Sequence, residues 1–327
     1  GGQALHAVIG IGTLVAFKEY IHRFFVPLRD FSQKYAVMQS AMASAERIFQ
    51  LLDTEVTIES PKSAVVPKPF RGEVVFDNVW FHYKPDDPVL KGVSFRIEPG
   101  ERVALVGATG SGKTTTIKLL NRFYDIQKGS IRVSGADIRD WDLAALRRHI
   151  GVVLQDVFLF SGDVRANLAL GDRTIPMDRV ERAARLSNAE SFIRELPDRY
   201  QAQVRERGSN FSGGQRQLLS LARVLVFQPE ILVMDEATSS IDTETELLIQ
   251  DALDKVMKGR TCLVIAHRLS TIRNADRIIV LHHGEVREVG SHSELMEKQG
   301  IYHRLYQLQY ERKDAGSAAA VSSDAHG

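Results

Sequence analysis

The segment GATGSGKTTT, residues 107–116, constrains the fold of this chain more than any other part of its sequence. It follows the apolar run RVALV and continues into TIKLLNRF, which has a helical pattern. It fits the pattern G-x-x-x-x-G-K-[S/T], whose fixed positions here are Gly107, Gly112, Lys113 and Thr114. Glycines let the backbone curl so that successive N–H groups point inward at phosphate oxygens, and the following helix adds its N-terminal dipole. The segment therefore predicts a phosphate-binding loop between a strand and a helix.

Two side chains of this loop have predicted roles. Lys113 would bridge the β- and γ-phosphates of a nucleotide, and Thr114 would supply a hydroxyl to Mg²⁺. The alternative is a glycine-rich turn with an exposed lysine, which the strand and helix flanks disfavour. We predict nucleotide contacts along the whole loop, from Gly107, Thr109, Gly110, Ser111, Gly112, Lys113, Thr114 and Thr115.

Composition excludes some classes of protein. Of the 327 residues, 44% are apolar and 25% charged, which indicates a folded chain of one large or two smaller domains. A net charge of +1 gives no electrostatic reason to expect nucleic acid as a partner. The single cysteine cannot form an intrachain disulfide and favours a reducing, cytosolic setting. This residue, Cys262, lies in the apolar run TCLVIA and is predicted to be an inert buried thiol.

The N-terminal segment has the pattern of a helix from a membrane bundle. The apolar run ALHAVIGIGTLVAF is shorter than the roughly 20 residues that a spanning helix needs, but it becomes long enough if the helix continues through KEYIHRFFVPL. That continuation carries i, i+4 pairs, Lys18/His22 and Glu19/Arg23, on one side. An ordinary core helix of a soluble domain is the alternative, and a cleaved signal peptide is less favoured. The next segment, FSQKYAVMQSAMASAERIFQLLD, predicts an amphipathic helix.

The remainder of the chain predicts an α/β domain that follows a linker. Pro61, Pro67 and Pro69 interrupt any regular structure before Gly72. The runs VVFDNVWFHY and VSFRI then predict antiparallel strands. Beyond Val103, apolar strand-like runs alternate with helical stretches, as in a domain with a parallel sheet. The small, polar tail AGSAAAVSSDAHG predicts disorder.

The segment ILVMDEATSSID, residues 231–242, supplies a second part of the site. Its four apolar residues predict a buried strand that brings two carboxylates to its C-terminal end, where ligands gather in open α/β sheets. Asp235 would hold Mg²⁺, and Glu236 would polarise an attacking water as general base. A helix N-cap with a favourable charge is the alternative for these two acids.

A third segment, NFSGGQRQLLSLARVL, predicts a helix that is capped by Ser212. The N-terminus of this helix is predicted to bind an anion. Here the sequence resembles the ATP-binding cassette family, whose signature is usually LSGGQ. Phe211 replaces the leucine, and the matching residues are Ser212, Gly213, Gly214 and Gln215. Further matches follow in the family's order, namely the aromatic Tyr83, the glutamine-loop Gln155, Asp242 of SSID and the switch histidine His267. The resemblance covers about residues 73–310.

The resemblance implies a role for each of these residues. Tyr83 would stack on adenine, Ser212–Gln215 would complete the ATP site of a partner cassette, and Asp242 would communicate across the dimer. The catalytic residues would be Glu236, His267 and Gln155, and the Mg²⁺ ligands Thr114, Gln155 and Asp235. Taken singly, Tyr83, Gln155 and His267 each have a structural alternative. Phe211 and Arg205 depart from the family pattern. These departures are expected to leave ATP chemistry in place and to affect how the cassette couples to the membrane domain.

The expected fold is a P-loop α/β cassette with an antiparallel β subdomain and a helical signature subdomain, preceded by a membrane-derived helix. The expected domains are the last transmembrane helix with its cytoplasmic extension (1–52), a linker (53–72), the nucleotide-binding domain (73–312) and a disordered tail (313–327). Five further membrane helices are expected upstream.

The resemblance implies an ATPase that drives export across the inner (plasma) membrane, with the cassette in the cytoplasm. Its partners would be a second half-transporter, identical or homologous, and a transmembrane domain in the lipid bilayer, without nucleic acid. A soluble cassette ATPase of repair or translation type, an importer subunit and a non-hydrolysing scaffold are the alternatives.

Overall fold

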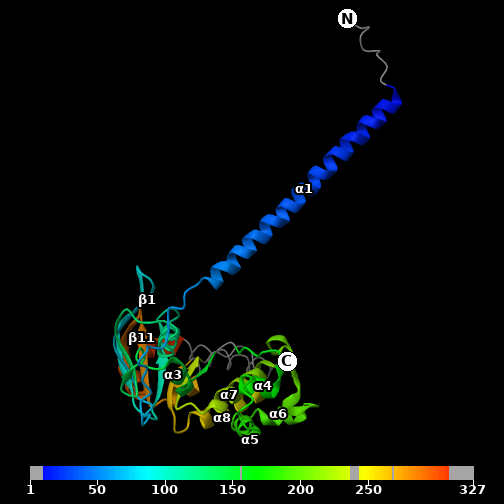
Figure 1. Cartoon of the computed structure of the whole chain (residues 1–327). Helices are drawn as coiled ribbons and strands as arrows, with labels where there is room; N and C mark the ends of the chain where they lie inside the picture. Colours follow the sequence, from blue (N-terminus) through cyan, green and yellow to red (C-terminus); the bar gives the residue numbers. More distant parts are fainter. Residues whose placement is uncertain (1–9, 155–156, 236–242, 267–268, 309–327) are drawn as a thin grey trace, which may run out of the picture. The chain divides into compact units, whose positions relative to one another are not determined.

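The computed structural model of this chain describes residues 10–154, 157–235, 243–266 and 269–308 (Figure 1). The chain divides into two compact units, Gly1–Thr57 and Ile58–Gly327. The expected catalytic positions Gln155, Glu236 and His267, and the expected dimer residue Asp242, lie outside the described residues.

The described part of the first unit consists mainly of one helix, α1 (Ile11–Leu52), with Pro27 inside it. Of the two predicted i, i+4 pairs, Glu19/Arg23 forms an ion pair in α1, since Arg23 Nε lies 2.9 Å from Glu19 Oε1. No residue of the helix is buried. Within the described residues, no helix combines the length and the apolar character that crossing a membrane requires. The transmembrane origin of α1 therefore stays a prediction.

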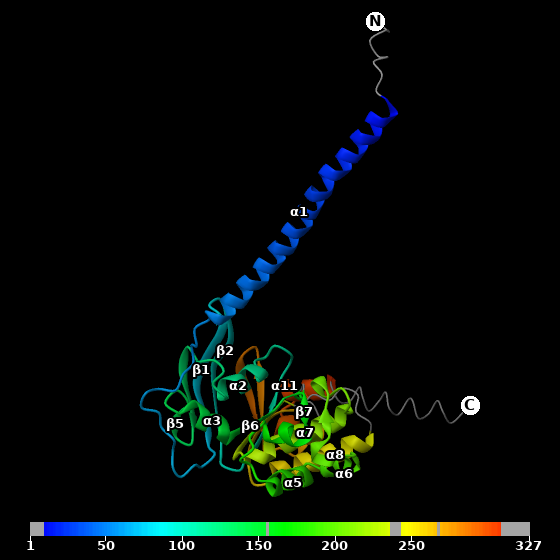
Figure 2. The same cartoon turned by 45° about the vertical axis from the view of Figure 1, so that its right-hand side comes forward.

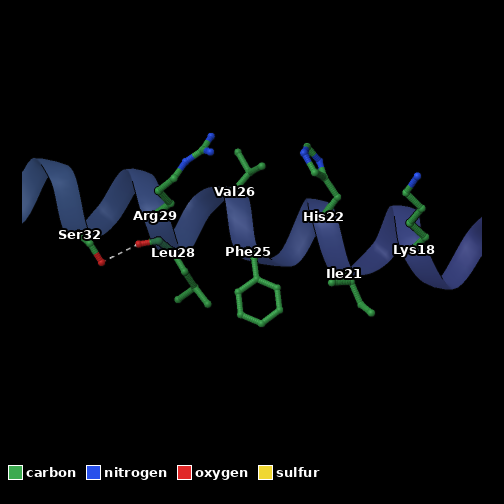
Figure 3. Close-up of a pocket in the computed structure, with 8 residues that line it drawn as sticks. All are labelled: Lys18, Ile21, His22, Phe25, Val26, Leu28, Arg29 and Ser32. Carbon is green, nitrogen blue, oxygen red and sulfur yellow. Dashed lines mark hydrogen bonds between the residues drawn. The ribbon is translucent and has the colours of Figure 1, made fainter.

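One stretch of α1 carries most of its apolar side chains on one side, although Val26 lies on the side of the basic residues (Figure 3). Ile21, Phe25 and Leu28 point to one side of the helix, whereas His22 and Arg29 point to the other. The shallow hollow in this region is lined by α1 residues alone, so it is a helix surface and not an enclosed cavity.

The second unit is organised around a six-stranded sheet of order β12-β11-β3-β10-β9-β6. All neighbours in it are parallel except β11 and β12, which pair antiparallel. Its strands are β3 (Arg102–Val106), β6 (Ile150–Val153), β9 (Ile231–Asp235), β10 (Thr261–Ile265), β11 (Arg277–His282) and β12 (Glu285–Gly290). The alternation of apolar strands and helices had predicted this parallel sheet, which is confirmed.

A second sheet, of order β2-β1-β4-β5, is antiparallel throughout. It consists of β1 (Val74–Lys84), β2 (Asp87–Ile97), β4 (Lys128–Val133) and β5 (Ala136–Asp137). The two runs that had predicted antiparallel strands form β1 and β2, so this prediction is also confirmed. In Figure 2 these strands lie on one side of the second unit, and helices α5, α6 and α8 lie on the other.

The remaining elements are mostly helical and lie in the loops between strands. They are α2 (Lys113–Leu120), α3 (Leu143–His149), α4 (Val164–Ala169), α5 (Met177–Leu186), α6 (Glu190–Glu195), α7 (Gly213–Phe227), α8 (Thr243–Met257), α9 (Leu269–Arg273), α10 (His292–Glu297), α11 (Ile301–Tyr306) and the short pair β7 (Gly162–Asp163) and β8 (Gln203–Val204), with single turns at Arg199–Gln201 and Glu206–Gly208.

The central sheet separates two hydrophobic cores because successive side chains of a strand point to opposite faces. In β3, Val103 and Leu105 belong to the core shared with the antiparallel sheet, whereas Ala104 and Val106 belong to the core shared with the helices. Strands β9 and β10 alternate in the same way. Cys262 of β10 faces the helical core, and burial raises the pKa of its thiol to about 12, as expected for an inert thiol.

The segment that precedes β1 is irregular but packs on the second unit. Ser60 Oγ accepts a hydrogen bond from Leu143 N at 2.8 Å, at the start of α3. Phe70 stacks on His149 at the other end of α3, with ring centroids 4.2 Å apart. The segment that precedes β1 therefore contacts both ends of α3.

We predict that Leu105→Ala destabilises the cassette strongly. The Leu105 side chain is fully buried in the central strand, and such truncations leave a cavity that costs about 2–5 kcal/mol. The midpoint of urea unfolding should fall accordingly.

The matched control is Leu247→Ala, because Leu247 is 67% exposed on α8. This change should alter the free energy of unfolding by less than about 0.5 kcal/mol. Equal effects of the two variants would contradict the assignment of Leu105 to the core.

Candidate functional site

The predicted phosphate-binding loop connects the central strand β3 to α2, as its sequence context required. At two positions of the loop, neighbouring atoms lie so close to the backbone that only glycine fits. A Cβ at Gly107 would overlap the carbonyl oxygen of Leu281, and a Cβ at Gly112 would lie 2.5 Å from Leu90 Cδ2. Gly112 also has a φ of 104°, which favours glycine. The loop therefore packs its backbone directly against β11 and β2.

Lys113 holds its ammonium within this loop. Its Nζ donates hydrogen bonds to the carbonyl oxygens of Gly107 at 2.8 Å and Ala108 at 3.0 Å. Burial lowers the pKa of Lys113, and the carboxylate of Asp235 acts in the opposite direction. A half-buried cation thus lies beside backbone that the glycines keep accessible, which suits an anionic ligand.

The other residues of the loop differ in exposure. Thr109 and Gly110 are exposed, whereas Thr115 is buried at the start of α2. The hydroxyl of Ser111 is buried, and within the described part of the chain it has no hydrogen-bond partner. A buried orphan hydroxyl is costly unless a ligand satisfies it. The Ser111 side chain is therefore consistent with the nucleotide contact predicted for it.

Thr114 and Asp235 come together although they are distant in the sequence. Asp235 ends β9, and Thr114 lies in the first turn of α2. The Thr114 hydroxyl donates to Asp235 Oδ2 at 3.4 Å. A hydroxyl and a carboxylate are the oxygen donors that Mg²⁺ prefers. These two residues fit a Mg²⁺ site, and among the described residues no cluster of three acidic, histidine or cysteine side chains offers another.

Tyr83 lies near the end of β1 and is 46% exposed. Its hydroxyl shares a hydrogen bond of 3.2 Å with Thr115 Oγ1, in the helix that begins at the phosphate-binding loop. The structure thus brings Tyr83, predicted to bind the adenine, next to the residues predicted to bind the phosphates.

The predicted signature helix is α7, and Ser212 caps it as expected. Ser212 Oγ accepts from Gln215 N at 3.1 Å, and Gln215 Oε1 accepts from Ser212 N at 3.0 Å, which completes a capping box. Ser212 is exposed, and open space surrounds the Cα of Gly213, whereas Gly214 is buried. This helix start therefore presents backbone N–H groups at the surface.

The two departures from the family pattern have different environments. Phe211 is buried in the helical core, where its ring lies 6.1 Å from that of Phe192. Arg205 is exposed, and its backbone N–H donates to Asn210 Oδ1. The phenylalanine thus replaces one apolar core residue with another and leaves the start of α7 unobstructed.

The strands that lead to the undescribed site residues all belong to the central sheet. β6 ends at Val153, β9 at Asp235 and β10 at Ile265, just before Gln155, Glu236 and His267 respectively. Because parallel strands share one carboxyl edge, the described ends of these three strands lie at the edge where the phosphate-binding loop begins. The roles of these three residues, and of Asp242, stay predictions.

Sequence reasoning missed the surroundings of Tyr83. The ring of Tyr124 lies 5.1 Å from that of Tyr83, and Lys118 Nζ lies 5.9 Å from the Tyr83 centroid. Lys118 falls one turn after Thr115 on α2, so helical spacing could have indicated it. No local signal connects Tyr124 to Tyr83, because Tyr124 lies in the turn between α2 and β4, which meets the end of β1 only in the tertiary structure.

We predict that Ser212→Ala lowers the free energy of unfolding by about 1 kcal/mol, because it removes the cap of α7. Ser212→Asn should retain most of the stability, since asparagine is also a good N-cap. Urea unfolding of both variants provides the measurement.

The exposed Ser209 is a nearby serine whose side chain makes no hydrogen bond to any residue that the structure describes, and Ser209→Ala serves as the control. An equal loss in Ser209→Ala and Ser212→Ala would contradict the capping role.

Comparison with known proteins agrees with these features. A family model described as "ABC transporter" matches residues 90–239. The chain is 46% identical over 315 residues to a probable multidrug resistance ABC transporter ATP-binding/permease protein of Bacillus subtilis, covering 96% of this chain and 46% of that protein. It is 42% identical over 309 residues to a fatty acid ABC transporter ATP-binding/permease protein of Mycobacterium bovis, covering 93% of this chain and 48% of that protein.

A solved structure of a bacterial Atm1-family ABC exporter with ATP bound is also similar. Its TM-score is 0.74 at 38% identity, and the match covers 92% of this chain and 53% of that one. The chain thus spans about half the length of the relatives it matches.

Proposed function

Because this chain belongs to the ATP-binding cassette family of transporters, we propose that it binds and hydrolyses ATP with Mg²⁺ to drive export across a membrane. The observation that carries the proposal is that three groups from two elements come together, Lys113 and Thr114 at the start of α2 and Asp235 at the end of β9. Lys113 lies within a glycine-shaped loop, and the Thr114 hydroxyl lies 3.4 Å from the Asp235 carboxylate. Together they place a cation beside two oxygen donors that would suit Mg²⁺, at the edge of the central sheet.

The proposed chemistry requires little from the protein beyond positioning and charge neutralisation. Lys113 and the N–H groups of the loop would hold the phosphates. Thr114, Asp235 and Gln155 would hold Mg²⁺, which neutralises phosphate charge when bound. Glu236 would accept a proton from the attacking water, and His267 would contact the γ-phosphate.

We further propose that each ATP site is shared by two cassettes arranged head to tail. The support is the exposed start of α7, where Ser212 and Gln215 form a capping box and Gly213 leaves the backbone accessible. A helix start of this kind attracts phosphate through its N–H groups and its dipole. ATP between this segment and a partner's phosphate-binding loop would favour the closed dimer.

We assign α1 to the end of a membrane domain that is fused to the cassette. The support is that the relatives are named ATP-binding/permease proteins and align with over nine-tenths of this chain. The exposed apolar side of α1 is consistent with this assignment. The proposed location is the inner (plasma) membrane with the cassette in the cytoplasm. The proposed partners are a second half-transporter, identical or homologous, and the membrane domain. We assign no cargo, because the relatives are named for different cargoes.

We predict that Glu236→Gln binds ATP but turns it over at least about 10²-fold more slowly, because the amide cannot accept a proton. Lys113→Ala should instead weaken ATP binding itself. Equilibrium binding and phosphate release, measured on both variants, separate the two effects. Normal turnover in Glu236→Gln would eliminate Glu236 as the base.

We predict that two inactive variants restore activity when they are mixed. Ser212→Arg obstructs the start of α7, and Lys113→Ala disables the phosphate-binding loop. In a mixed dimer both lesions fall on one shared site, and the other site is intact. Phosphate release should therefore recover to a measurable fraction of the wild-type rate, provided that one intact site can act alone.

The mixing experiment needs a series of protein concentrations, because the membrane domain that would keep two cassettes close contributes effective concentration. Sizing at each concentration identifies monomer and dimer. Turnover per chain that stays constant where only monomer is present would refute the shared site.

A further inference from the structure

The ring of Tyr83 is held by two other aromatic rings. Phe81 lies 4.8 Å away at an interplanar angle of 88°, and Tyr124 lies 5.1 Å away at 86°. Phe81 and Tyr124 also contact each other, at 5.8 Å. Because both neighbours stand almost perpendicular to Tyr83, neither is stacked parallel to it, and Tyr83 keeps 46% of its surface exposed. This arrangement fixes the plane of the ring without covering it.

The hydroxyl of Tyr83 is held by α2. It shares a hydrogen bond with Thr115 Oγ1, and the Lys118 ammonium, one turn further on, lies 5.9 Å from the ring centroid. The helix that begins at the phosphate-binding loop therefore also fixes the outer end of Tyr83.

The backbone next to Tyr83 is held by a side chain from another segment. Gln127 Oε1 accepts from His82 N at 3.0 Å, and Gln127 Nε2 donates to His82 O at 3.2 Å. The backbone pairing of β1 with β4 ends at Trp80 and Lys128. The amide of Gln127 thus continues the ladder beyond the last strand pair, at the residue immediately before Tyr83.

Tyr124 and Gln127 belong to one turn, residues 121–127, which follows α2 directly. Arg147 of α3 donates to the carbonyl oxygens of Asn121 at 3.2 Å and Arg122 at 3.0 Å. The buried Arg122 in turn pairs with Asp125 at 2.9 Å. These contacts cross-link the turn to α3 and give it a fixed position from which to hold Tyr83.

We propose that Tyr124 and Gln127 are positioning residues for the nucleobase, which hold Tyr83 in the orientation needed to stack on adenine. The inference rests on the proposed ATP binding and deepens it. Tyr124 acts on the ring and Gln127 acts on the backbone. Neither residue belongs to a hydrophobic core, and Tyr124 is 41% exposed, so packing alone does not account for the contacts of Tyr124. A ring that is ordered before binding loses less conformational entropy on binding.

The test is equilibrium binding of Mg²⁺–ATP and of Mg²⁺–tripolyphosphate to the full chain. Tyr124→Ala should weaken ATP binding about three- to tenfold and leave tripolyphosphate binding unchanged, because tripolyphosphate has no base. Tyr124→Phe should bind like the wild type, since it retains the ring. Gln127→Leu should shift ATP binding in the same direction as Tyr124→Ala.

Phe123→Ala is the matched control. Phe123 is adjacent in the chain and similarly exposed, at 48%, but its ring lies 5.2 Å from the guanidinium of Arg147. Its removal should leave the ratio of ATP to tripolyphosphate affinity unchanged. If the turn had a purely structural role, its variants would weaken the binding of ATP and of tripolyphosphate equally. This result would overturn the proposal.

A double-mutant cycle separates positioning from direct contact. In a Tyr83→Ala background, Tyr124→Ala should change ATP affinity by less than about 1.5-fold, because the ring on which it acts is absent. A full effect of Tyr124→Ala in that background would overturn the proposal. If Tyr83→Ala alone leaves ATP affinity unchanged, the stacking role of Tyr83 fails. If Tyr83→Ala weakens ATP and Tyr124→Ala does not, only the positioning role fails.

Discussion

The parallel central sheet must be covered on both faces, and the organisation of the cassette follows from this constraint. Strands β3, β9, β10 and β11 are almost entirely apolar, so each contributes alternate residues to two cores. The antiparallel sheet covers one face together with α2 and α3, and the helices from α4 to α11 cover the other. The strand ends themselves cannot be covered in this way. The polar residues therefore gather at the carboxyl edge of the sheet, where β3 continues into the phosphate-binding loop.

The two cores give the proposed site its two different parts. The antiparallel sheet carries Tyr83, which binds to α2 through Thr115. The helical layer carries α7, whose capped start lies at the surface. One cassette thus carries the proposed base and phosphate site on one core and the proposed anion-binding helix start on the other. This division is the geometric reason that two cassettes, and not one, are proposed to complete each ATP site.

The charge at the phosphate-binding loop comes from residues of the loop itself and its direct neighbours, and not from the net charge of the chain. The net charge of the chain is only +1, yet Lys113 is half buried among carbonyl oxygens, where burial lowers its pKa. The carboxylate of Asp235 opposes that shift. A site formed in this way would bind an anion through short-range geometry and would not need a basic surface.

The sequence by itself determined the local features, namely the phosphate-binding loop, the antiparallel strands, the buried strand that ends at Asp235 and the cap at Ser212. Each depends on residues close together in the chain, whose spacing fixes backbone geometry. Only the tertiary structure decided which side chains meet. β10 lies between β3 and β9 although it follows both in the chain, and this strand order brings Thr114 to Asp235. Likewise, the tertiary structure brings the turn that carries Tyr124 and Gln127 to the end of β1, and core packing buries Phe211. Such long-range contacts arise from strand order and packing, which no local pattern encodes.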